Sequence, residues 1–231
     1  MLKKYRHLFF DLDNTLWDFR ANAYDALHEI FTTLDLFDRV PDFSEFLCAY
    51  EKYNEYLWGE YRKGRLRKEF LRTERIKLAF HEMGVDDPEL ANKIEKLFVQ
   101  TMPQKTNLFP CVHETLRYLS NKYRLYILTN GFAELQVQKI NNAGLQPYFQ
   151  KLFMAEMVGY QKPDRRFFEY AIKSAHAHKI ECLMIGDDPE VDIVGARNSG
   201  IDQVFFNPAA KPCKIVPTWE IGSIAMLMKI L

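Results

Sequence analysis

One short stretch near the start of the chain restricts the possible folds more than any other. In residues 7–16 an apolar run over 8–10 leads directly into Asp11 and Asp13. The pattern predicts a buried strand, and open α/β sheets bind their ligands at the carboxyl ends of such strands. Two carboxylates this close together repel, so they need a cation or a shared proton. The stretch therefore predicts a metal-assisted site.

A long helical region follows this strand. Its apolar residues recur at three- and four-residue intervals, which is typical of amphipathic helices, and no convincing strand pattern interrupts them. We expect the region to form a small helical bundle. The four expected helices cover about residues 21–34, 43–61, 66–83 and 88–98.

From residue 109 onward, expected strands alternate with expected helices. The strands are expected at about 123–129, 151–155, 181–185 and 203–206, and the helices at about 112–120, 133–142, 163–178 and 190–198. Such alternation indicates right-handed βαβ units and a parallel sheet. We therefore predict an α/β fold with a doubly wound, Rossmann-like core formed by residues 1–16 and 107–231. A helical cap, residues 17–106, would be inserted after the first strand.

Composition narrows the possible partners. The chain has 31 basic and 31 acidic residues, so no net charge favours nucleic acid or a membrane surface. No stretch approaches the roughly 20 apolar residues of a membrane span. The four cysteines are scattered without a paired framework, as expected for reduced thiols in the cytoplasm.

Chemically active residues collect at the predicted strand ends. The acidic ones are Asp11, Asp13, Asp187, Asp188 and Asp192, and the others are Thr129, Asn130, Gly131 and Lys162. Carboxylates suit Mg²⁺, a hard ion that prefers oxygen ligands. A hydroxyl group, backbone amides and an ammonium group suit an anion. Together they predict a phosphate group held beside Mg²⁺.

Four segments of this set resemble the four motifs of the haloacid dehalogenase-like hydrolase superfamily, in order. They are residues 11–15, 128–131, 159–164 and 186–192, and the helical insert resembles the cap that some members carry after the first motif. The resemblance implies an enzyme, a phosphoric monoester hydrolase that uses Mg²⁺, for which Mn²⁺ can substitute. Its partner would be a small phosphate ester, and the chain would be a monomer or small homo-oligomer.

The resemblance also implies a role for each residue of the motifs. Asp11 would attack phosphorus to form an aspartyl-phosphate, and Asp13 would act as general acid and then as general base. Lys162 would neutralise charge between Asp11 and the phosphate. Thr129, Asn130 and Gly131 would bind the phosphoryl oxygens together with Lys162. Asp187 would hold Mg²⁺ with Asp11 and the backbone carbonyl of Asp13, and Asp188 and Asp192 would support the metal less directly.

The second acid of the first motif, Asp13, indicates which kind of leaving group the enzyme would release. A halide leaves without a proton whereas an alkoxide needs one, so Asp13 favours phosphate ester hydrolysis over dehalogenation. Within the superfamily the nearest resemblance is to bacterial pyrimidine 5′-nucleotidases, which act on nucleoside monophosphates. The segments that carry it are 11–19, 58–64 with Leu66, Glu69, Leu71 and Arg75, and 130–132 with Gln136. Trp17 and Phe19 are candidates for contact with the leaving group.

Other interpretations stay open at this level. The substrate could be phosphoglycolate or a sugar phosphate, and a phosphomutase would retain the same acid. A catalytically idle binding or scaffold protein on the same fold would require damaged motifs, and none is visible. Individually, Thr129 could simply end a strand, Lys162 could be solvated, and Asp188 and Asp192 could complement a helix dipole.

Overall fold

The chain divides into two compact units. A computed structural model describes residues 5–40 and 42–231, so residues 1–4 at the start of the predicted core lie outside it. Unit 1 comprises Met1–Arg20 and Thr106–Leu231, and unit 2 comprises Ala21–Lys105.

A parallel sheet forms the centre of unit 1. Its strands are β1 (His7–Phe10), β2 (Arg124–Thr129), β3 (Phe149–Met154), β4 (Cys182–Gly186), β5 (Asp202–Phe206) and β6 (Trp219–Ile221). They lie in the order β3-β2-β1-β4-β5-β6, and every neighbouring pair is parallel. This confirms the predicted α/β fold. Strand β6 was not predicted, because three residues are too few to show a periodic pattern.

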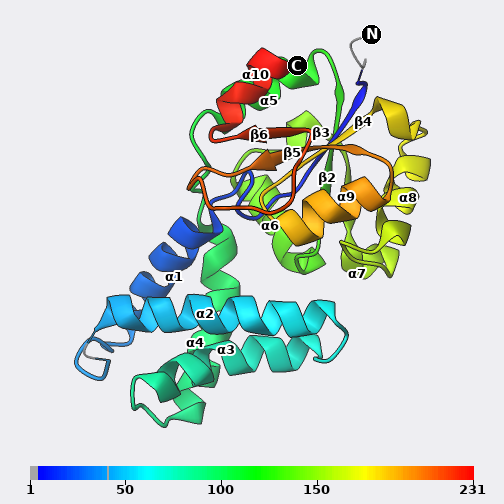
Figure 1. Cartoon of the computed structure of the whole chain (residues 1–231). Helices are drawn as coiled ribbons and strands as arrows, with labels where there is room; N and C mark the ends of the chain where they lie inside the picture. The colour runs from blue at the N-terminus through cyan, green and yellow to red at the C-terminus, as the bar shows by residue number, and fades with distance from the viewer. Residues whose placement is uncertain (1–4, 41) are drawn as a thin grey trace. The chain divides into compact units, whose positions relative to one another are not determined.

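Helices cover both faces of this sheet. The α-helices of the second segment of unit 1 are α5 (Val112–Ser120), α6 (Ala133–Asn142), α7 (Ala155–Val158), α8 (Arg165–Ser174), α9 (Val194–Asn198) and α10 (Leu227–Ile230). Helices α8 and α9 pack on one face through a cluster that includes Phe9, Phe168 and Met184. Figure 1 shows α5 and α10 together on the other side. Helix α8 ends earlier than the predicted residue 178, because His176 has a positive φ of 50° that an α-helix cannot contain.

Strand β1 occupies the middle of the sheet although it comes first in the chain. Its four residues are buried on both faces, as expected for a parallel strand covered by helices on each side. It pairs in register with β2 on one edge and β4 on the other, so the residues that follow these three strands emerge next to one another. This placement determines where the polar residues of the strand ends meet.

In unit 2, all the regular elements among the described residues are helices. Its helices are α1 (Phe19–Thr33, which begins in unit 1), α2 (Phe43–Arg62), α3 (Lys68–Glu82) and α4 (Pro88–Thr101), followed by a short 3₁₀ turn (Met102–Gln104). Asp42 and Asp87 accept hydrogen bonds from backbone N–H groups at the starts of α2 and α4, which fixes where those helices begin. Phe31, Phe46 and Phe80 pack together and link α1, α2 and α3.

The segments that enter and leave unit 2 pair with each other. The N–H of Asp18 donates to the carbonyl of Asn107 (3.0 Å), and the N–H of Phe109 donates to the carbonyl of Leu16 (3.0 Å). These hydrogen bonds tie the two connections together within unit 1. Across the described part of the chain, every helix is too short or too polar to cross a membrane.

A buried ion pair joins two helices of unit 2. Arg75 of α3 donates two hydrogen bonds to Glu95 of α4, at 2.7 and 3.1 Å, and both side chains are at most 6% exposed. A third hydrogen bond links Arg75 to Asn54 of α2 (3.1 Å). Removing one member of such a pair leaves the other charge buried and uncompensated, which is far more costly than losing an exposed pair.

We therefore expect Glu95→Ala to lower the free energy of unfolding of unit 2 by about 3–5 kcal/mol. Urea denaturation followed by circular dichroism measures this change. Glu82→Ala is the matched control, since Glu82 pairs with the exposed Lys52 (2.6 Å) and its loss should leave the unfolding midpoint unchanged. Equal urea midpoints for the two variants would contradict the stabilising role given to the buried pair of Arg75 and Glu95.

Candidate active site

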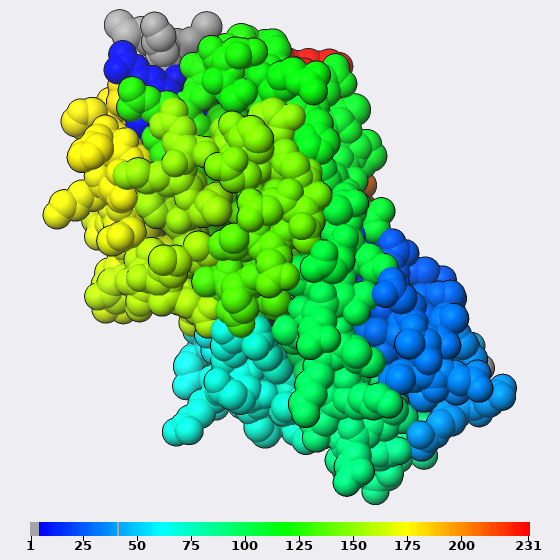
Figure 2. Space-filling model, turned by 180° about the vertical axis from the view of Figure 1, so that it is seen from behind, coloured from blue at the N-terminus to red at the C-terminus, as the bar shows by residue number. Residues whose placement is uncertain are grey.

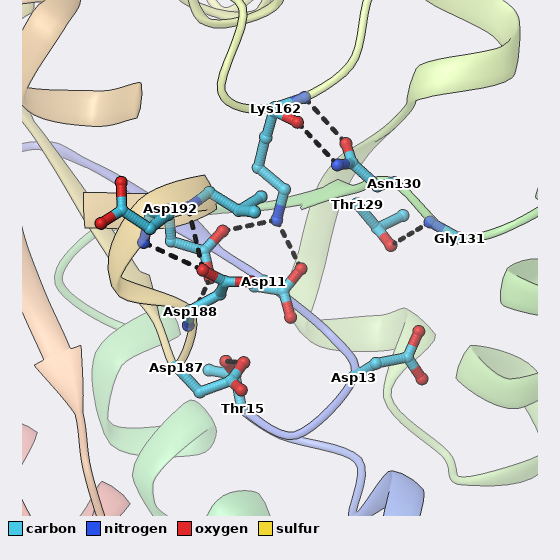
Figure 3. Close-up of polar contacts among 12 residues, drawn as sticks. Asp11, Asp13, Thr15, Thr129, Asn130, Gly131, Lys162, Asp187, Asp188 and Asp192 are labelled. Carbon is cyan, nitrogen blue, oxygen red and sulfur yellow. Dashed lines mark hydrogen bonds and ion pairs between the residues drawn. The ribbon is translucent and has the colours of Figure 1, made fainter. Parts of the chain in front are cut away.

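Three neighbouring strands deliver the polar residues to one edge of the sheet. Asp11 directly follows β1, and its N–H donates to the carbonyl of Ile185 in β4 (2.9 Å), which keeps its backbone in the sheet. Thr129 is the last residue of β2, and Asp187 directly follows β4. Figure 3 shows the side chains of these strand ends gathered around Lys162.

A buried lysine lies between two of the acids. The Nζ of Lys162 donates to Oδ1 of Asp11 (2.5 Å) and to Oδ1 of Asp192 (2.7 Å), and Lys162 is 1% exposed. Its backbone is held by Asn130, whose side-chain amide donates to the Lys162 carbonyl (2.9 Å) and accepts from the Lys162 N–H (2.8 Å). The loop after β2 thus positions the lysine that reaches Asp11 (Figure 3).

Three carboxylates form a set that can hold a metal ion. Asp11, Asp187 and Asp192 each place an oxygen within 4.8 Å of the others. Thr15 donates to Asp187 (3.0 Å), which orients that side chain. Lys162 supplies one positive charge against three carboxylates, so the ionised set would carry a net negative charge. Hard oxygen ligands with excess negative charge fit Mg²⁺.

The ionisation of these groups reflects burial and mutual repulsion. Burial raises the pKa of Asp11 to about 7 and outweighs the lowering effect of Lys162, while Asp192 and Asp13 add smaller increases. Burial also raises the pKa of Asp187 and that of Asp192 above the ordinary range. Burial alone would lower the pKa of Lys162, but Asp11 and Asp192 raise it, so the lysine stays charged. A bound divalent cation would relieve the repulsion among the carboxylates.

Asp188 and Asp192 play different parts in the turn after β4. Oδ1 of Asp188 accepts from the N–H groups of Glu190 (2.9 Å) and Val191 (3.0 Å), so this side chain caps the helical turn. Asp192 is buried, and its Oδ2 accepts from the Asp188 N–H (3.1 Å). A Cβ on Gly186 would lie 2.3 Å from Oδ2 of Asp192, so the close approach of this carboxylate requires glycine there.

Asp13 lies in a separate group of contacts. Figure 3 shows its carboxylate turned away from Asp11. One oxygen accepts from Nε2 of Gln136 (2.7 Å), and the other accepts from Nζ of Lys139 (2.6 Å). Lys139 also lies over the rings of Trp17 (4.3 Å to the centroid) and Phe19 (5.5 Å). Trp17 is fully buried and Phe19 half-buried, and their contact with a substrate stays a prediction.

Thr129 joins the two groups of residues. Its Oγ1 accepts from the N–H of Gly131 (3.0 Å) and from Nε2 of Gln136 (2.6 Å). A hydroxyl oxygen accepts two hydrogen bonds and donates one, so the hydrogen of Thr129 remains available to a ligand. A Cβ on Gly131 would lie 2.2 Å from Nε2 of Gln136, which explains why glycine follows Asn130.

The chain is similar to known proteins over most or all of its length. Residues 5–200 match the family model described as haloacid dehalogenase-like hydrolase. The chain belongs to the haloacid dehalogenase-like hydrolases. It is 30% identical to the HAD-hydrolase YfnB of Bacillus subtilis over 234 residues, which cover 100% of this chain and 97% of YfnB. A crystal structure of YfnB bound to magnesium has a TM-score of 0.89, with 28% identity over 99% of both chains.

Two further relatives carry an activity in their names. The pyrimidine 5′-nucleotidase YjjG of Escherichia coli is 29% identical over 99% of this chain and 98% of its own length. The pyrimidine 5′-nucleotidase PynA of Streptococcus pneumoniae is 30% identical over 97% of this chain and 94% of its own length. This hydrolase therefore resembles phosphate-ester hydrolases from end to end. The predicted superfamily and the predicted nucleotidase resemblance are both confirmed.

The predicted site residues fall into three groups in the structure. Asp11, Lys162, Asp187 and Asp192 converge, whereas Asp13 and Thr129 meet through Gln136, and Asp188 caps its own turn. The sequence interpretation did not assign the contacts of Lys139 or the side-chain role of Asn130. The signal for the former was available as two polar residues, Gln136 and Lys139, spaced i, i+3 on the helix after the second motif.

A hollow of about 710 Å³ opens at the opposite edge of the sheet. It is lined by residues at the amino ends of the strands, among them Arg6, His7, Lys122, Arg124 and His178. In Figure 2 the blue, green and yellow atoms of these segments adjoin at the upper left. This hollow is separate from the carboxylate set, which lies at the carboxyl ends of β1 and β4.

The raised pKa values give a testable dependence on pH and Mg²⁺. Between about pH 4 and pH 7 the metal-free folded protein binds more protons at Asp11 than the unfolded chain does, because its pKa is raised to about 7. The stability from this group is therefore complete at low pH and lost as the pH rises through about 7. We expect Mg²⁺ at a hundredfold excess over its Kd to raise Tm by roughly 5–10 °C at about pH 8, and by less at about pH 5.5 where protons compete.

Thermal unfolding with and without Mg²⁺ measures this effect. Asp187→Asn should abolish the Mg²⁺-dependent rise in Tm, and it should stabilise the metal-free protein because it removes repulsion from the set. Asp38→Asn, an exposed residue in unit 2, serves as the control and should behave as wild type. An unchanged response to Mg²⁺ in Asp187→Asn would contradict the assigned metal site.

Proposed function

We propose that this hydrolase is a Mg²⁺-dependent phosphomonoesterase that acts through an aspartyl-phosphate on Asp11. The observation that carries the proposal is the contact of Lys162 with Asp11 and Asp192 beside Asp187. Phosphoryl transfer requires positioning and neutralisation of charge on the transferring oxygens, and this arrangement can provide both.

In the first step Asp11 attacks the phosphorus atom. Lys162 holds Oδ1 of Asp11, while Oδ2 has no hydrogen bond in the described part of the chain and can form the bond to phosphorus. As the ester P–O bond breaks, Asp13 gives its proton to the leaving oxygen, which departs as an alcohol. The products of this step are an aspartyl-phosphate and an ionised Asp13.

In the second step a water molecule attacks the same phosphorus. Asp13 now accepts a proton from that water, and the bond between phosphorus and Asp11 breaks to release inorganic phosphate. Asp11 returns as a carboxylate and Asp13 returns protonated, so the cycle balances. The hydroxyl hydrogen of Thr129 and the ammonium group of Lys162 are the donors that we assign to the phosphoryl oxygens.

Asp11, Asp187 and Asp192 would hold Mg²⁺, together with the backbone carbonyl of Asp13. The bound ion would supply positive charge against the negative oxygens of the phosphoryl group. Asp188 would act less directly, because its side chain already caps the turn that carries Asp192.

We further propose pyrimidine nucleoside monophosphates as the substrates. Support comes from YjjG and PynA, which carry this activity in their names and resemble the whole chain. The helical residues 17–106 would act as the cap that selects the leaving group, and Trp17 and Phe19 are our candidates for that contact. A cytoplasmic location is supported by the absence of disulfides among the four cysteines, all of which the structure describes as free.

Asp11→Asn should abolish turnover of p-nitrophenyl phosphate while leaving the fold intact, because an amide cannot serve as the nucleophile. Steady-state assays with Mg²⁺ measure turnover, and circular dichroism checks the fold. Chelation by EDTA should silence the wild type, and added Mg²⁺ or Mn²⁺ should restore it. Substantial activity in Asp11→Asn, or indifference to EDTA, would contradict the mechanism.

A substrate panel tests the proposed specificity. We expect kcat/KM to be highest for UMP, dUMP and dTMP, and at least about tenfold lower for phosphoglycolate and hexose phosphates, a discrimination of about 1.4 kcal/mol. AMP is the matched control, since it differs from UMP only in the base. A preference for phosphoglycolate or a hexose phosphate would replace the nucleotidase assignment with another phosphatase, and isomerisation of a sugar phosphate would indicate a mutase.

A further inference from the structure

The acid/base residue of the proposed mechanism has two donors to which that mechanism gives no part. Gln136 and Lys139 are spaced i, i+3 on α6, so their side chains lie on the same face of the helix. Gln136 donates to Oδ2 of Asp13 (2.7 Å), and Lys139 donates to Oδ1 (2.6 Å). Each carboxylate oxygen of Asp13 thus has a donor of its own.

Both donors are more deeply buried than the residue they hold. Gln136 is 0% exposed and Lys139 is 4% exposed, whereas the side chain of Asp13 is 25% exposed. Gln136 is anchored a second time by its hydrogen bond to Thr129 (2.6 Å) and fits only because Gly131 has no Cβ. The geometry of Asp13 is therefore determined by a buried framework.

The side-chain amide of Gln136 directs its nitrogen, not its oxygen, toward hydrogen-bond partners. Its Oε1 is buried and has no hydrogen-bond partner in the described part of the chain, while Nε2 donates twice. An unsatisfied buried oxygen destabilises a fold. The amide keeps this orientation although Oε1 is left unpaired. Such an exception calls for an explanation, and a function for the two hydrogen bonds from Nε2 provides one.

Aromatic rings hold Lys139 from another side. Its Nζ is 4.3 Å from the centroid of the Trp17 ring and 5.5 Å from that of Phe19, distances at which a cation is attracted to an aromatic face. Trp17 is brought beside Asp13 by a tight turn, in which the N–H of Asn14 donates to the Trp17 carbonyl (2.8 Å). The ammonium group is thus fixed between the rings and the carboxylate.

We propose that Gln136 and Lys139 are positioning residues that orient Asp13 for proton transfer. This inference rests on the proposed function, because it assigns their effect to the acid/base role of Asp13. A purely structural role is the alternative: the buried Lys139 would need Asp13 merely as a counter-ion, and Gln136 would only support the loop after β2. The two roles differ in which substrates they affect.

Two aryl phosphates of nearly the same shape separate these roles. p-Nitrophenolate is a stable anion that leaves without a proton, whereas phenolate is a poorer leaving group that benefits from one. The value of kcat/KM covers the steps up to departure of the phenol. A misplaced Asp13 should therefore lower kcat/KM for phenyl phosphate far more than for p-nitrophenyl phosphate, while a structural defect should lower both alike.

The variants to be compared are Gln136→Leu and Lys139→Met. We expect each to lower kcat/KM for phenyl phosphate by about 10²-fold, and for p-nitrophenyl phosphate by less than about tenfold. Because Asp13 also serves as base in the second step, rapid mixing with p-nitrophenyl phosphate should show a burst of about one p-nitrophenolate per active site. The rise in Tm with Mg²⁺ should persist, which reports a folded core with an intact metal site.

The chain offers matched controls on exposed surfaces. Gln138→Leu lies on the same helix, where the exposed Gln138 donates to the backbone carbonyl of Glu134, and Lys173→Met lies in the last turn of α8. Both should retain wild-type values for the two substrates. Gln136→Met is a second variant of similar length in case Gln136→Leu does not fold.

A double-mutant cycle tests whether these residues act through Asp13. Asp13→Asn alone should shift the ratio of the two kcat/KM values, and adding Lys139→Met to it should shift the ratio no further. An additional shift, or an equal loss for both substrates in the single variants, would overturn the positioning role. Failure of the wild type to hydrolyse either ester would instead refute the proposed function.

Discussion

The buried contact of Lys162 with Asp11 and Asp192 is the interaction on which the rest of the site depends. Withdrawing an ammonium group from water costs several kcal/mol unless opposite charges meet it at close range. Here two carboxylates do so, one after β1 and one in the turn after β4. Asn130 holds the lysine backbone from the end of β2, so the side chain and backbone of Lys162 together link the ends of three neighbouring strands.

Asp11 and Asp13 are suited to different roles because their neighbours differ. Asp11 faces a buried lysine and two further carboxylates, and its pKa is raised chiefly because it is buried. Asp13, two residues later, is held instead by an amide and a second lysine from α6. One carboxylate is thus placed among groups that suit a nucleophile and metal ligand, and the other stands apart in a place suited to proton transfer.

The sequence predicts the fold well because apolar strands and their polar ends are local signals. The strand of residues 7–10 and the acids after it could be assigned from periodicity and strand-end chemistry alone. Strand β6 could not, since three residues show no period, and neither could the end of α8, which depends on a left-handed His176. The contacts of Asn130 with Lys162, and of Gln136 and Lys139 with Asp13, were not assigned, because these partners lie 32 to 126 positions away and meet only in the folded chain.

The central position of β1 has a consequence for the order in which the protein can be built during translation. Strand β1 is synthesised before the other strands, and its neighbours β2 and β4 begin only at residues 124 and 182. The helical unit 2, residues 21–105, lies between β1 and β2 in the sequence, so it is synthesised before either neighbour of β1. The native partners of β1 in the sheet are therefore absent until more than half of these 231 residues have been made, and the contact of Asp11 with Lys162 and Asp192 needs residues as late as 192.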